Sequence, residues 1–394
     1  MSVGEIRRLQ AEEAGEIVAW LTGYSLEPSP PLPDKAERQE ILKRRKGVIY
    51  LGMFEDNQPA ACVASTQMTQ HVRERSYGMG GVWAVATHPA ARRKGYSRRL
   101  LVELLTIMRK EGQPLSGLYP FRESFYERLG YVTFPLGRKA IFNSSALAPL
   151  LDWDLEGEVE MASFGEAFKA YRAYCRELLT RTHGMALVEK AEESDWLSDK
   201  YWLALARVEG ETVGLMQYQL QGEQVTRFKL QAVRFYYHDV RGRYLLLNWI
   251  ARHIDQAETV ELWLPPYEWP ETWAADMAVR IESLTRAAMG RVVDVTGIGG
   301  MRVGEGGFTF NLHDPQCSWN EGIWRFEALD GDLQVSPAKR AECELYIQGL
   351  SALVYGTHDP GDFRWREWGN PSEEVQAIMR RMFPPRLPYI HEFF

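Results

Sequence analysis

The sequence has few cysteines, and none of them lies in a paired motif. Among its 394 residues there are four cysteines, namely Cys62, Cys175, Cys317 and Cys343. Their spacing contains no C-x-x-C pair and is typical of neither a zinc site nor a disulfide framework. We therefore expect four reduced and buried thiols.

Long hydrophobic runs are also missing. No window approaches the roughly 18 consecutive apolar residues that a membrane-spanning helix needs. The residues after Met1 include Glu5, Arg7 and Arg8 and contain no apolar core of a secretory signal. Since 45% of the residues are hydrophobic and 25% are charged, the sequence predicts a soluble cytoplasmic protein of about two or three domains.

Motifs for several kinds of chemistry are absent as well. The eight histidines show neither H-x-x-x-H nor H-E-x-x-H spacing, so no metal site is expected. The chain also lacks the G-x-S-x-G motif of serine hydrolases and the Walker motif of nucleotide-binding loops. Its net charge of -7 argues against a nucleic-acid partner and suits a cationic substrate.

The most informative segment that is present runs from Gly81 to Leu101 and reads GVWAVATHPAARRKGYSRRLL. Val82 to Ala86 is typical of a short buried strand, and a helix is expected from Ser97 onward. The apolar residues of that helix recur on one face, at Leu100, Leu101, Leu104, Leu105 and Met108. An apolar strand thus leads through a glycine-bearing loop into an amphipathic helix.

The loop between this strand and helix has the features of a phosphate-binding cradle. Gly95 allows the backbone to approach a ligand closely. The first N–H groups of a helix have no intrahelical partner, and the helix dipole favours an anion at that end. Arg92, Arg93 and Lys94 add positive charge beside it.

Two motifs at the expected separation resemble the GNAT acetyltransferases. The spacing Arg92-x-x-Gly95-x-Ser97 is similar to their pyrophosphate-binding signature R/Q-x-x-G-x-G/A, with Ser97 where glycine or alanine is usual. After the helix, residues 114–131 resemble the next GNAT strand followed by the helix that carries F-Y-x-x-x-G-Y. The resemblance implies that acetyl coenzyme A (acetyl-CoA) is the co-substrate.

The rest of the first domain is expected to complete a mixed sheet. The expected elements are helices over 11–21 and 35–44, a hairpin of strands 47–54 and 60–67, and an edge strand over 131–142. The proline-rich loop 27–34 between the helices is of a kind that often covers an acceptor site. We expect the domain to end near residue 145.

The middle of the chain looks like a degenerate copy of the first domain. Residues 202–218 repeat the hairpin pattern of residues 49–67, and residues 233–252 repeat the order of strand, loop and amphipathic helix. The loop sequence Arg241-Gly-Arg243 lacks both the pyrophosphate-binding spacing and the run of cations. We therefore expect this domain to bind no coenzyme and to serve as a scaffold.

The last third of the chain is expected to be rich in strands. The expected elements are strands over 306–312, 322–328 and 332–335, a turn at Asp330-Gly331, and a helix over about 344–356. The series F-x-x-x-D-P-x-x-x-W-N-x-G followed by L-S-A-L-V-Y-G resembles a sterol-carrier-type domain. Such a domain either binds an apolar ligand or acts as a structural module, and the sequence leaves both possibilities open.

This order of parts resembles the Eis (enhanced intracellular survival) family of bacterial N-acetyltransferases over essentially the whole chain. The resemblance implies an α+β fold with two tandem GNAT-type acyl-CoA N-acyltransferase domains, a catalytic one over 1–145 and a degenerate one over 146–288. A sterol-carrier-like domain over 289–394 follows. In that family the carboxyl terminus threads back into the first active site, and this chain ends in PPRLPYIHEFF at residues 384–394. Its prolines lower the entropy cost of ordering such a tail, and the family also forms hexamers.

Acetyl transfer requires an attacking amine, donors for the oxyanion and a proton for the departing thiolate. We expect Val85 N–H to polarise the acetyl oxygen. The resemblance implies Tyr126 as the acid, since the phenol pKa of ~10 lies near the ~8.5 of a thiol. It assigns the base to the terminal carboxylate of Phe394, which is weakly basic and must act through its position. The residues expected at the coenzyme are Val85, Thr87, Arg92, Arg93, Lys94, Gly95 and Ser97.

The acceptor is the least defined part of the expected site. The resemblance implies aminoglycoside antibiotics acetylated at more than one amine, and an acidic, aromatic cleft suits such polycations. The candidate lining residues are Tyr24, Glu27, Trp83 and Glu392. A polyamine or a protein lysine is an alternative acceptor, and a non-enzymatic lipid- or ligand-binding protein is a second alternative.

Overall fold

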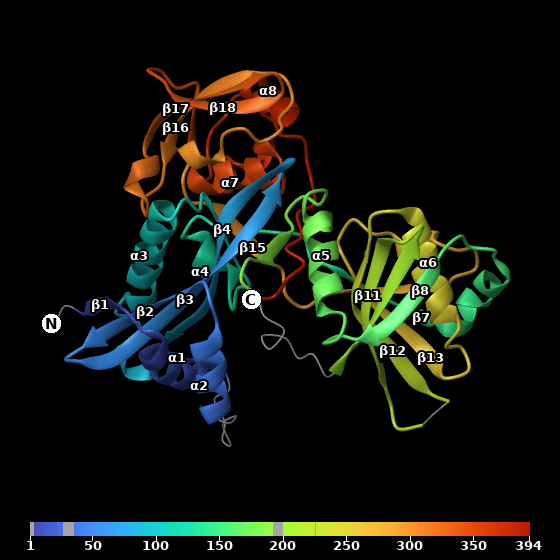
Figure 1. The fold of residues 1–394 in the computed structure, drawn as a ribbon. Helices are drawn as coiled ribbons and strands as arrows, with labels where there is room; N and C mark the ends of the chain where they lie inside the picture. Colours follow the sequence, from blue (N-terminus) through green and yellow to red (C-terminus); the bar gives the residue numbers. More distant parts are fainter. Residues whose placement is uncertain (1–3, 27–34, 192–199, 225) are drawn as a thin grey trace. The chain divides into compact units, whose positions relative to one another are not determined.

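The structure is a computed structural model that describes residues 4–26, 35–191, 200–224 and 226–394 (Figure 1). The chain divides into two compact units. The first unit combines residues 1–134, 182–191 and 288–394, and the second combines residues 135–181 and 192–287. Each unit is therefore built from segments that are distant in the sequence.

The first unit contains an eight-stranded mixed sheet in the order β1-β2-β3-β4-β5-β15-β6, with β9 paired to β3. Its strands are β1 (Glu5–Arg8), β2 (Val48–Glu55), β3 (Gln58–Val72), β4 (Arg75–Thr87), β5 (Leu115–Leu118), β6 (Val132–Thr133), β9 (Ala186–Val188) and β15 (Met289–Val292). Strands β1 to β4 are antiparallel, whereas β4 and β5 are parallel. A crossover helix is needed to join a parallel pair, and α3 (Tyr96–Lys110) supplies it.

Helices cover both faces of this sheet. The apolar face predicted for α3 is confirmed, because Leu100, Leu101, Leu104, Leu105 and Met108 are all buried. On the other face lie α1 (Ala11–Leu26) and α2 (Lys35–Arg44), and the latter has the bounds expected from the sequence. A short helix, α4 (Glu123–Glu127), follows β5.

The second unit repeats this topology. Its seven-stranded sheet has the order β14-β7-β13-β12-β11-β10-β8. Strands β10, β11 and β12 are antiparallel, and α6 (Val240–Ala251) then connects β12 to the parallel strand β13. The remaining bounds are β7 (Arg138–Asn143), β8 (Glu158–Ser163), α5 (Phe168–Leu179), β10 (Trp202–Val208), β11 (Glu211–Gln221), β12 (Phe228–Tyr237), β13 (Ala257–Leu264) and β14 (Arg280–Ser283).

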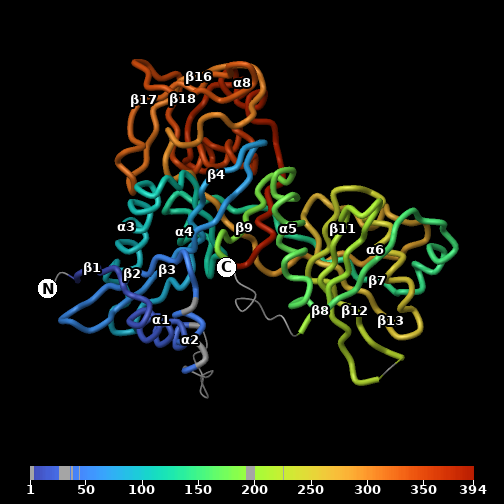
Figure 2. The backbone as a smooth tube through the Cα atoms, viewed as in Figure 1, coloured from blue at the N-terminus to red at the C-terminus, as the bar shows by residue number. Residues whose placement is uncertain are grey.

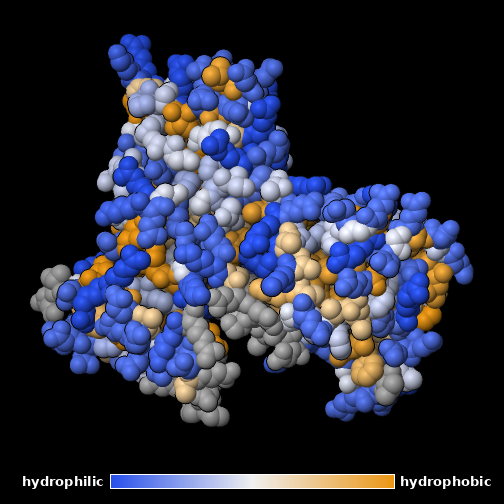
Figure 3. Space-filling view, in the orientation of Figure 1, coloured by the Kyte–Doolittle hydropathy of each residue, from blue (hydrophilic) through white to orange (hydrophobic). Residues whose placement is uncertain are grey.

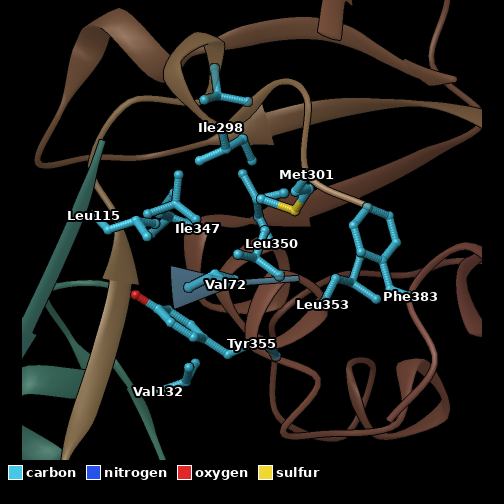
Figure 4. Packing of buried hydrophobic residues seen from close by; sticks show 14 of the residues in the cluster. Val72, Leu115, Val132, Ile298, Met301, Ile347, Leu350, Leu353, Tyr355 and Phe383 are labelled. Atoms are coloured by element: carbon cyan, nitrogen blue, oxygen red, sulfur yellow. The ribbon is translucent and has the colours of Figure 1, made fainter. Parts of the chain in front are cut away.

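The end of the chain adds a four-stranded sheet in the order β18-β17-β16-β19 to the first unit. Its elements are β16 (Gly307–His313), β17 (Gly322–Leu329), β18 (Asp332–Pro337), β19 (Cys343–Tyr346), α7 (Ile347–Tyr355) and α8 (Glu373–Met382). Figure 4 shows α7 residues such as Leu353 and Tyr355 beside Val72, from the tip of β3. One hydrophobic core thus joins this part to the first sheet.

Several elements differ from the sequence expectations. The single edge strand expected over 131–142 is split into β6 and β7, which belong to different sheets, because Pro135 and Gly137 interrupt it. The helix expected from about 344 begins as β19, since Cys343 pairs in parallel with Phe310 of β16. The sequence analysis also missed β15, a four-residue strand too short for its pattern to be recognised.

The cysteines and the surface have the character of a folded globular protein. All four cysteines are buried thiols outside any disulfide, and burial raises the pKa of the Cys62 thiol to about 12. The face of the molecule seen in Figure 3 is mostly hydrophilic with smaller hydrophobic areas between. Within the described residues, no helix is long and apolar enough to cross a membrane.

Candidate active site

A notch opens between β4 and β5 of the first sheet. The two strands pair in parallel from Met79 with Leu115 to Val82 with Leu118, where β5 ends. Strand β4 continues to Thr87 and stays paired only with β3 in the described part of the chain. One backbone edge of Trp83–Thr87 is therefore left without a strand partner and faces the notch.

A β-bulge lies in β4 at this notch. Pairing with β3 passes from Trp83 opposite Ala64 to Ala86 opposite Cys62, so that Ala84 and Val85 lie opposite the single residue Val63. Ala84 adopts a positive φ of 52°, which is uncommon for a residue with a side chain. The extra residue breaks the regular ladder at Val85, the residue expected to polarise the acetyl oxygen.

The start of α3 is open to a ligand. Gly95 occupies the N-cap position with φ 80° and provides no side-chain cap. A Cβ atom added at Gly95 would have no neighbour within 4 Å, so the space above the helix start is empty of protein atoms. The first intrahelical bond runs from Arg99 N–H to Gly95 O at 3.1 Å. The preceding N–H groups are thus available to an anion.

The end of β4 is tied directly to the first turn of α3. The hydroxyl oxygens of Thr87 and Ser97 lie 2.6 Å apart in a hydrogen bond. Ser97, which replaces the usual glycine or alanine of the signature, therefore has a local structural contact. The bond holds the strand end and the helix start beside each other.

The cations of the loop differ in their availability. Arg92 and Arg93 are exposed, and Arg92 Nε only reaches the Thr87 carbonyl at 3.5 Å. Lys94 Nζ instead lies 2.8 Å from both carboxylate oxygens of Glu55. The hydrogen bond between them lowers the pKa of Glu55 and raises that of Lys94. The Lys94 ammonium is thus already paired with Glu55, whereas the two arginines of the loop are exposed.

The two tyrosines of the F-Y-x-x-x-G-Y motif have different surroundings. The Tyr131 hydroxyl is fully buried and lies 2.7 Å from Ser116 Oγ, which in turn donates to Gly80 O. The Tyr126 side chain is 3% exposed, and its hydroxyl makes no hydrogen bond to any described residue. Burial raises the pKa of Tyr126 above its usual value, so the phenol stays protonated at neutral pH. Tyr126 thus has a free proton to donate, whereas Tyr131 is engaged in the core.

The carboxyl terminus lies at the first sheet. Figure 2 shows the C-terminal segment, in red, running beside β9 to its end. The Phe394 ring seats against Gly81 of β4, where an added Cβ atom would come within 2.7 Å of Phe394 Cδ2. Tyr119, just after β5, contacts the rings of Phe393 and Phe394 at 4.6 and 5.8 Å between centroids. Among described residues, no lysine, arginine or histidine nitrogen lies within 4.0 Å of the terminal carboxylate.

Tyr126 and Phe394 reach β4 from opposite faces of the sheet. Successive side chains of a strand alternate between faces, so Gly81 and Val82 mark the two sides. Val82 shares a buried cluster with Tyr126 and the apolar face of α3. Phe394 packs on the Gly81 side. A proton donor therefore lies on the side of the α3 cradle, and a carboxylate-bearing residue lies on the other.

Sequence comparisons match two parts of the chain. Residues 5–134 match acetyltransferase (GNAT) domains, and residues 300–391 match sterol carrier protein domains. The first part of the chain is a GNAT acetyltransferase domain. The protein is therefore an enzyme, an N-acetyltransferase of the GNAT type. No curated protein matches the sequence.

Solved structures share the fold at low sequence identity. A GCN5-related N-acetyltransferase from Anabaena variabilis has a TM-score of 0.83 at 15% identity and covers 99% of this chain and 100% of its own. A probable N-acyltransferase from Enterococcus faecalis gives 0.82 at 18% and covers 100% of both chains. Eis1 from Mycobacterium abscessus gives 0.77 at 16%, again with 100% of both. The predicted α+β architecture, with a second GNAT-like sheet and a sterol-carrier-like end, is confirmed.

The candidate acceptor residues of the GNAT domain lie in different places. Trp83 is on the Gly81 face, donates to Thr66 Oγ1 at 2.9 Å and carries the Arg45 guanidinium 4.7 Å from its ring centroid. Tyr24 is exposed near the end of α1. Glu27 lies outside the described residues. Glu392 is 1% exposed, and its Oε2 accepts from Val188 N–H at 2.6 Å. This carboxylate therefore binds the C-terminal tail to β9.

Two residues at the GNAT notch were missed by the sequence analysis. Gly81 receives the Phe394 ring, and Tyr119 packs against both terminal phenylalanines. The run Gly78-Met-Gly-Gly81 was a usable signal, because glycine inside a strand marks a close approach by another group. Nothing in the sequence around Tyr119 distinguishes it from an ordinary core tyrosine.

Proposed function

We propose that this enzyme belongs to the Eis family and transfers acetyl groups from acetyl-CoA to amines of a polycationic small molecule, of which aminoglycosides acetylated at several positions are the leading class. The observation that carries the proposal is the seat of Phe394 against Gly81, which brings the end of the chain to the GNAT notch. A polyamine or a protein lysine would use the same catalytic groups and differ only in the acceptor cleft.

The first unit offers a fitting site for the co-substrate. The open edge of Trp83–Thr87 would pair with the amides of the pantetheine arm, and Val85 at the bulge would direct its N–H to the acetyl oxygen. The pyrophosphate would lie on the free N–H groups above Gly95. Arg92, Arg93 and, when released by Glu55, Lys94 would add charge to that site.

The two faces of the notch would divide the proton transfers. An amine entering on the Gly81 side would attack the thioester carbon, and the bulge N–H would stabilise the oxyanion that forms. Tyr126 on the opposite side would protonate the departing thiolate. The Phe394 carboxylate, which has no cationic partner in the described chain, would bind the incoming ammonium and take up its proton, directly or through water.

Charge and packing support the assignment of the other parts. The net charge of -7 favours a cationic acceptor, and Trp83 already carries one cation, Arg45, on its ring. The interior of the sterol-carrier-like part is filled by contacting rings, including Phe308, Phe310 and Phe326. We therefore assign it a structural role. The three-part division at 145 and 288, the hexamer and the cytoplasmic location remain predictions.

The test uses tag-free enzyme with acetyl-CoA and a panel of kanamycin-like aminoglycosides, polyamines and a lysine-bearing peptide. Release of free thiol gives the rate, and mass spectrometry counts the acetyl groups added. The same assay is run on a chain lacking Phe394 and on Phe394→Ala, which keeps a terminal carboxylate but removes the ring. Calorimetry measures acetyl-CoA binding by each variant.

Turnover of aminoglycosides with more than one acetyl added is the expected result. Loss of Phe394 should lower kcat by about 10²- to 10⁴-fold, the usual contribution of a general acid or base, with acetyl-CoA binding retained. The kcat of Phe394→Ala should lie between that of the chain lacking Phe394 and that of the intact enzyme. Undiminished turnover without Phe394 would remove the carboxylate from the mechanism, and turnover of polyamines or peptide alone would reassign the acceptor.

A further inference from the structure

The tip of the β3–β4 hairpin holds the C-terminal tail far from its end. Arg73, in the two-residue turn of this hairpin, has a fully buried side chain. Its guanidinium donates to Leu353 O at 2.9 Å and Val354 O at 2.8 Å, at the end of α7. It also donates to Pro384 O at 3.1 Å, at the start of the tail. One side chain thus joins the GNAT sheet, α7 and the tail.

The charge of Arg73 is stabilised by backbone carbonyl groups and by the ring of Phe383, whose centroid lies 5.2 Å from the guanidinium carbon. The three oxygens to which it donates belong to the backbone, and two of them lie at the negative end of the α7 dipole. Burial lowers the pKa of Arg73 to about 9, which still leaves it charged at neutral pH. Removing the side chain would take this donor from the Val354 and Pro384 carbonyls, and a buried carbonyl that loses its donor is costly. The arrangement is therefore specific to a multi-donor cation.

The neighbouring turn residue adds a second tie. Glu74 accepts a hydrogen bond from Arg386 Nη2 at 3.1 Å. The Arg386 backbone N–H donates to Gly356 O at 3.1 Å, just past the end of α7. Residues 384–386 of the tail are thus bound by both residues of the hairpin turn and by the helix cap.

Glycines line the path that the tail takes from there to β4. An added Cβ atom would meet the tail at Gly356 (Arg386 N, 2.6 Å), Gly184 (Pro388 Cβ, 2.6 Å), Gly117 (Ile390 Cδ1, 3.2 Å) and Gly81 (Phe394 Cδ2, 2.7 Å). The first two also have positive φ, 73° and 83°, which favours glycine independently. The four glycines come from separate chain segments, and together they leave room for one ordered path.

A second fixed point lies at β9. Ala186 N–H donates to Ile390 O at 3.0 Å, and Val188 N–H donates to Glu392 Oε2 at 2.6 Å. The intervening strand β9 pairs with β3 on its other edge. The tail is therefore bound along the second edge of β9 at Ile390 and Glu392, and the chain reaches Phe394 two residues later.

We propose that Arg73 is a positioning residue for catalysis: the β3–β4 hairpin tip fixes the tail at Pro384, so that Glu392 docks on β9 and the terminal carboxylate arrives at the notch. This inference rests on the proposed role of that carboxylate. The same hairpin carries the coenzyme edge of β4 at one end and Arg73 at the other. The position of the terminal carboxylate is thus set from the strand that also binds the acetyl donor.

The experiment compares Arg73→Met, Arg73→Lys and the control Arg75→Met. Arg75 lies on the same hairpin and is exposed, and its guanidinium donates to Gly300 O at 3.4 Å and lies 5.9 Å from the Tyr77 ring centroid, away from the tail. Hydrogen exchange, resolved to single amides, is followed at Ala186 and Val188, whose N–H groups bond the tail. Glu189 N–H, which bonds Gln67 O of β3, is the internal reference. Steady-state kinetics give kcat and the KM for acetyl-CoA.

Arg73→Met should speed exchange at Ala186 and Val188 at least ~10-fold relative to Glu189 and lower kcat about 10- to 100-fold, because a displacement of ~1 Å can cost that much. The KM for acetyl-CoA should stay within about 2-fold, since the α3 cradle is untouched. For Arg73→Lys, both the exchange rates and kcat should lie between those of Arg73→Met and of the intact enzyme, because an ammonium keeps the charge but reaches fewer carbonyls. Arg75→Met should match the intact enzyme.

Unchanged exchange at Ala186 and Val188 in both Arg73 variants would overturn the inference. Faster exchange with full kcat would keep Arg73 as the tail clamp but remove the carboxylate from catalysis, so the two proposals fail separately. If Arg73→Met does not fold, Arg73→Lys alone decides, because an ammonium reaches fewer of the three carbonyls than the guanidinium does.

A second pair of variants tests the docking of the tail on β9. Glu392→Gln keeps an oxygen acceptor for Val188 N–H, whereas Glu392→Ala removes it. If Glu392 positions the tail, Gln should retain kcat within about 3-fold and Ala should behave like Arg73→Met. If Glu392 instead binds the cationic acceptor through its charge, Gln and Ala should both raise the KM for the acceptor, and that result would contradict its positioning role.

Discussion

The two GNAT-like sheets of this protein share a topology but differ at the start of the crossover helix. In the first sheet, Gly95 caps α3 without a side chain and leaves its N–H groups free. In the second, Asp239 caps α6, and its carboxylate accepts from Arg241 N–H at 2.8 Å. An acidic side chain thus occupies the place where the first unit would receive a pyrophosphate.

The cation near this second helix start is also neutralised. Arg241 Nη2 lies 2.6 Å from Asp239 Oδ2, and the hydrogen bond between them lowers the pKa of Asp239. The only comparable pair in the first loop, Lys94 with Glu55, leaves Arg92 and Arg93 exposed. The loop of the second unit therefore lacks the positive potential of the first.

Side chains fill the end of β12 in the second unit. Trp273 stacks on Phe235 at 5.7 Å between centroids, and Arg243 from the first turn of α6 lies 5.3 Å from the Trp273 ring. Tyr237 bonds Glu268 at 2.5 Å beside them. In the second unit, side chains thus occupy the region that corresponds to the notch of the first unit, while the sheet and its crossover helix keep the same arrangement.

The largest expected effect concerns the proton donor of the first sheet. Tyr126→Phe should lower kcat about 10²- to 10⁴-fold, because the thiolate loses its acid, and should leave acetyl-CoA binding intact. A thiol-release assay measures kcat, and calorimetry measures acetyl-CoA binding. Tyr131→Phe is the control, since it removes a hydroxyl that is bonded to Ser116. Equal losses of kcat in both variants would contradict the assignment of Tyr126.

A direct transplant of the second unit's cap should disable the first. Gly95→Asp should raise the KM for acetyl-CoA about 10- to 100-fold, because it adds a carboxylate at the phosphate site and forces a side chain into positive φ. Gly95→Asn tolerates that φ without the charge and should show a smaller rise. Asp239→Gly in the second unit should leave the KM unchanged. If Gly95→Asp and Gly95→Asn raised the KM for acetyl-CoA equally, the added negative charge would not be the cause of the rise.

The first unit should be sensitive to acid through one buried histidine. His183 Nδ1 accepts from Arg73 N–H at 3.1 Å while Nε2 bonds Tyr355 O at 2.8 Å, and burial lowers its pKa to about 3. Between pH ~6.5, the usual histidine pKa, and pH 3, the unfolded chain binds a proton that the folded chain does not. The free energy of unfolding should therefore fall as pH drops through this window, by up to ~1.4 kcal/mol per pH unit.

Urea unfolding at pH 7.5 and 5.0 measures this dependence. His183→Gln removes the titrating group and should reduce the difference between the two pH values, although the variant is less stable at pH 7.5. An identical pH dependence in the intact protein and in His183→Gln would show that other groups cause it.

The smallest expected effect comes from the exposed pair in the first loop. Glu55→Gln should release Lys94 toward the phosphate site and lower the KM for acetyl-CoA by no more than about 3-fold, since exposed ion pairs are weak and screened by salt. The gain should shrink as salt is raised from low to physiological concentration. Arg241→Gln in the second unit should leave the KM for acetyl-CoA unchanged. If the lower KM of Glu55→Gln did not depend on salt, an electrostatic cause would be excluded.

Local patterns were sufficient for much of the fold. The apolar spacing of α3, the bounds of α2 and the Asp330-Gly331 turn with φ of 53° and 82° could be read directly, because each depends on neighbouring residues. The strand over 82–86 was found only as the last part of β4, whose first half is rich in glycine and polar residues. Strands β15 and β19 exist because distant partners pair with them.

The sequence by itself determined the cradle, the tyrosine motif and the family resemblance, since these lie in continuous segments with characteristic spacing. Only the tertiary structure decided that the Tyr126 hydroxyl bonds none of the described residues while that of Tyr131 is bound to Ser116, and that Glu392 is buried against Val188. It alone brought Arg73 to Pro384 and Phe394 to Gly81. The physical reason is that the contacts of Glu392, Arg73 and Phe394 join residues hundreds of positions apart, whose proximity depends on the packing of the whole unit and leaves no local pattern.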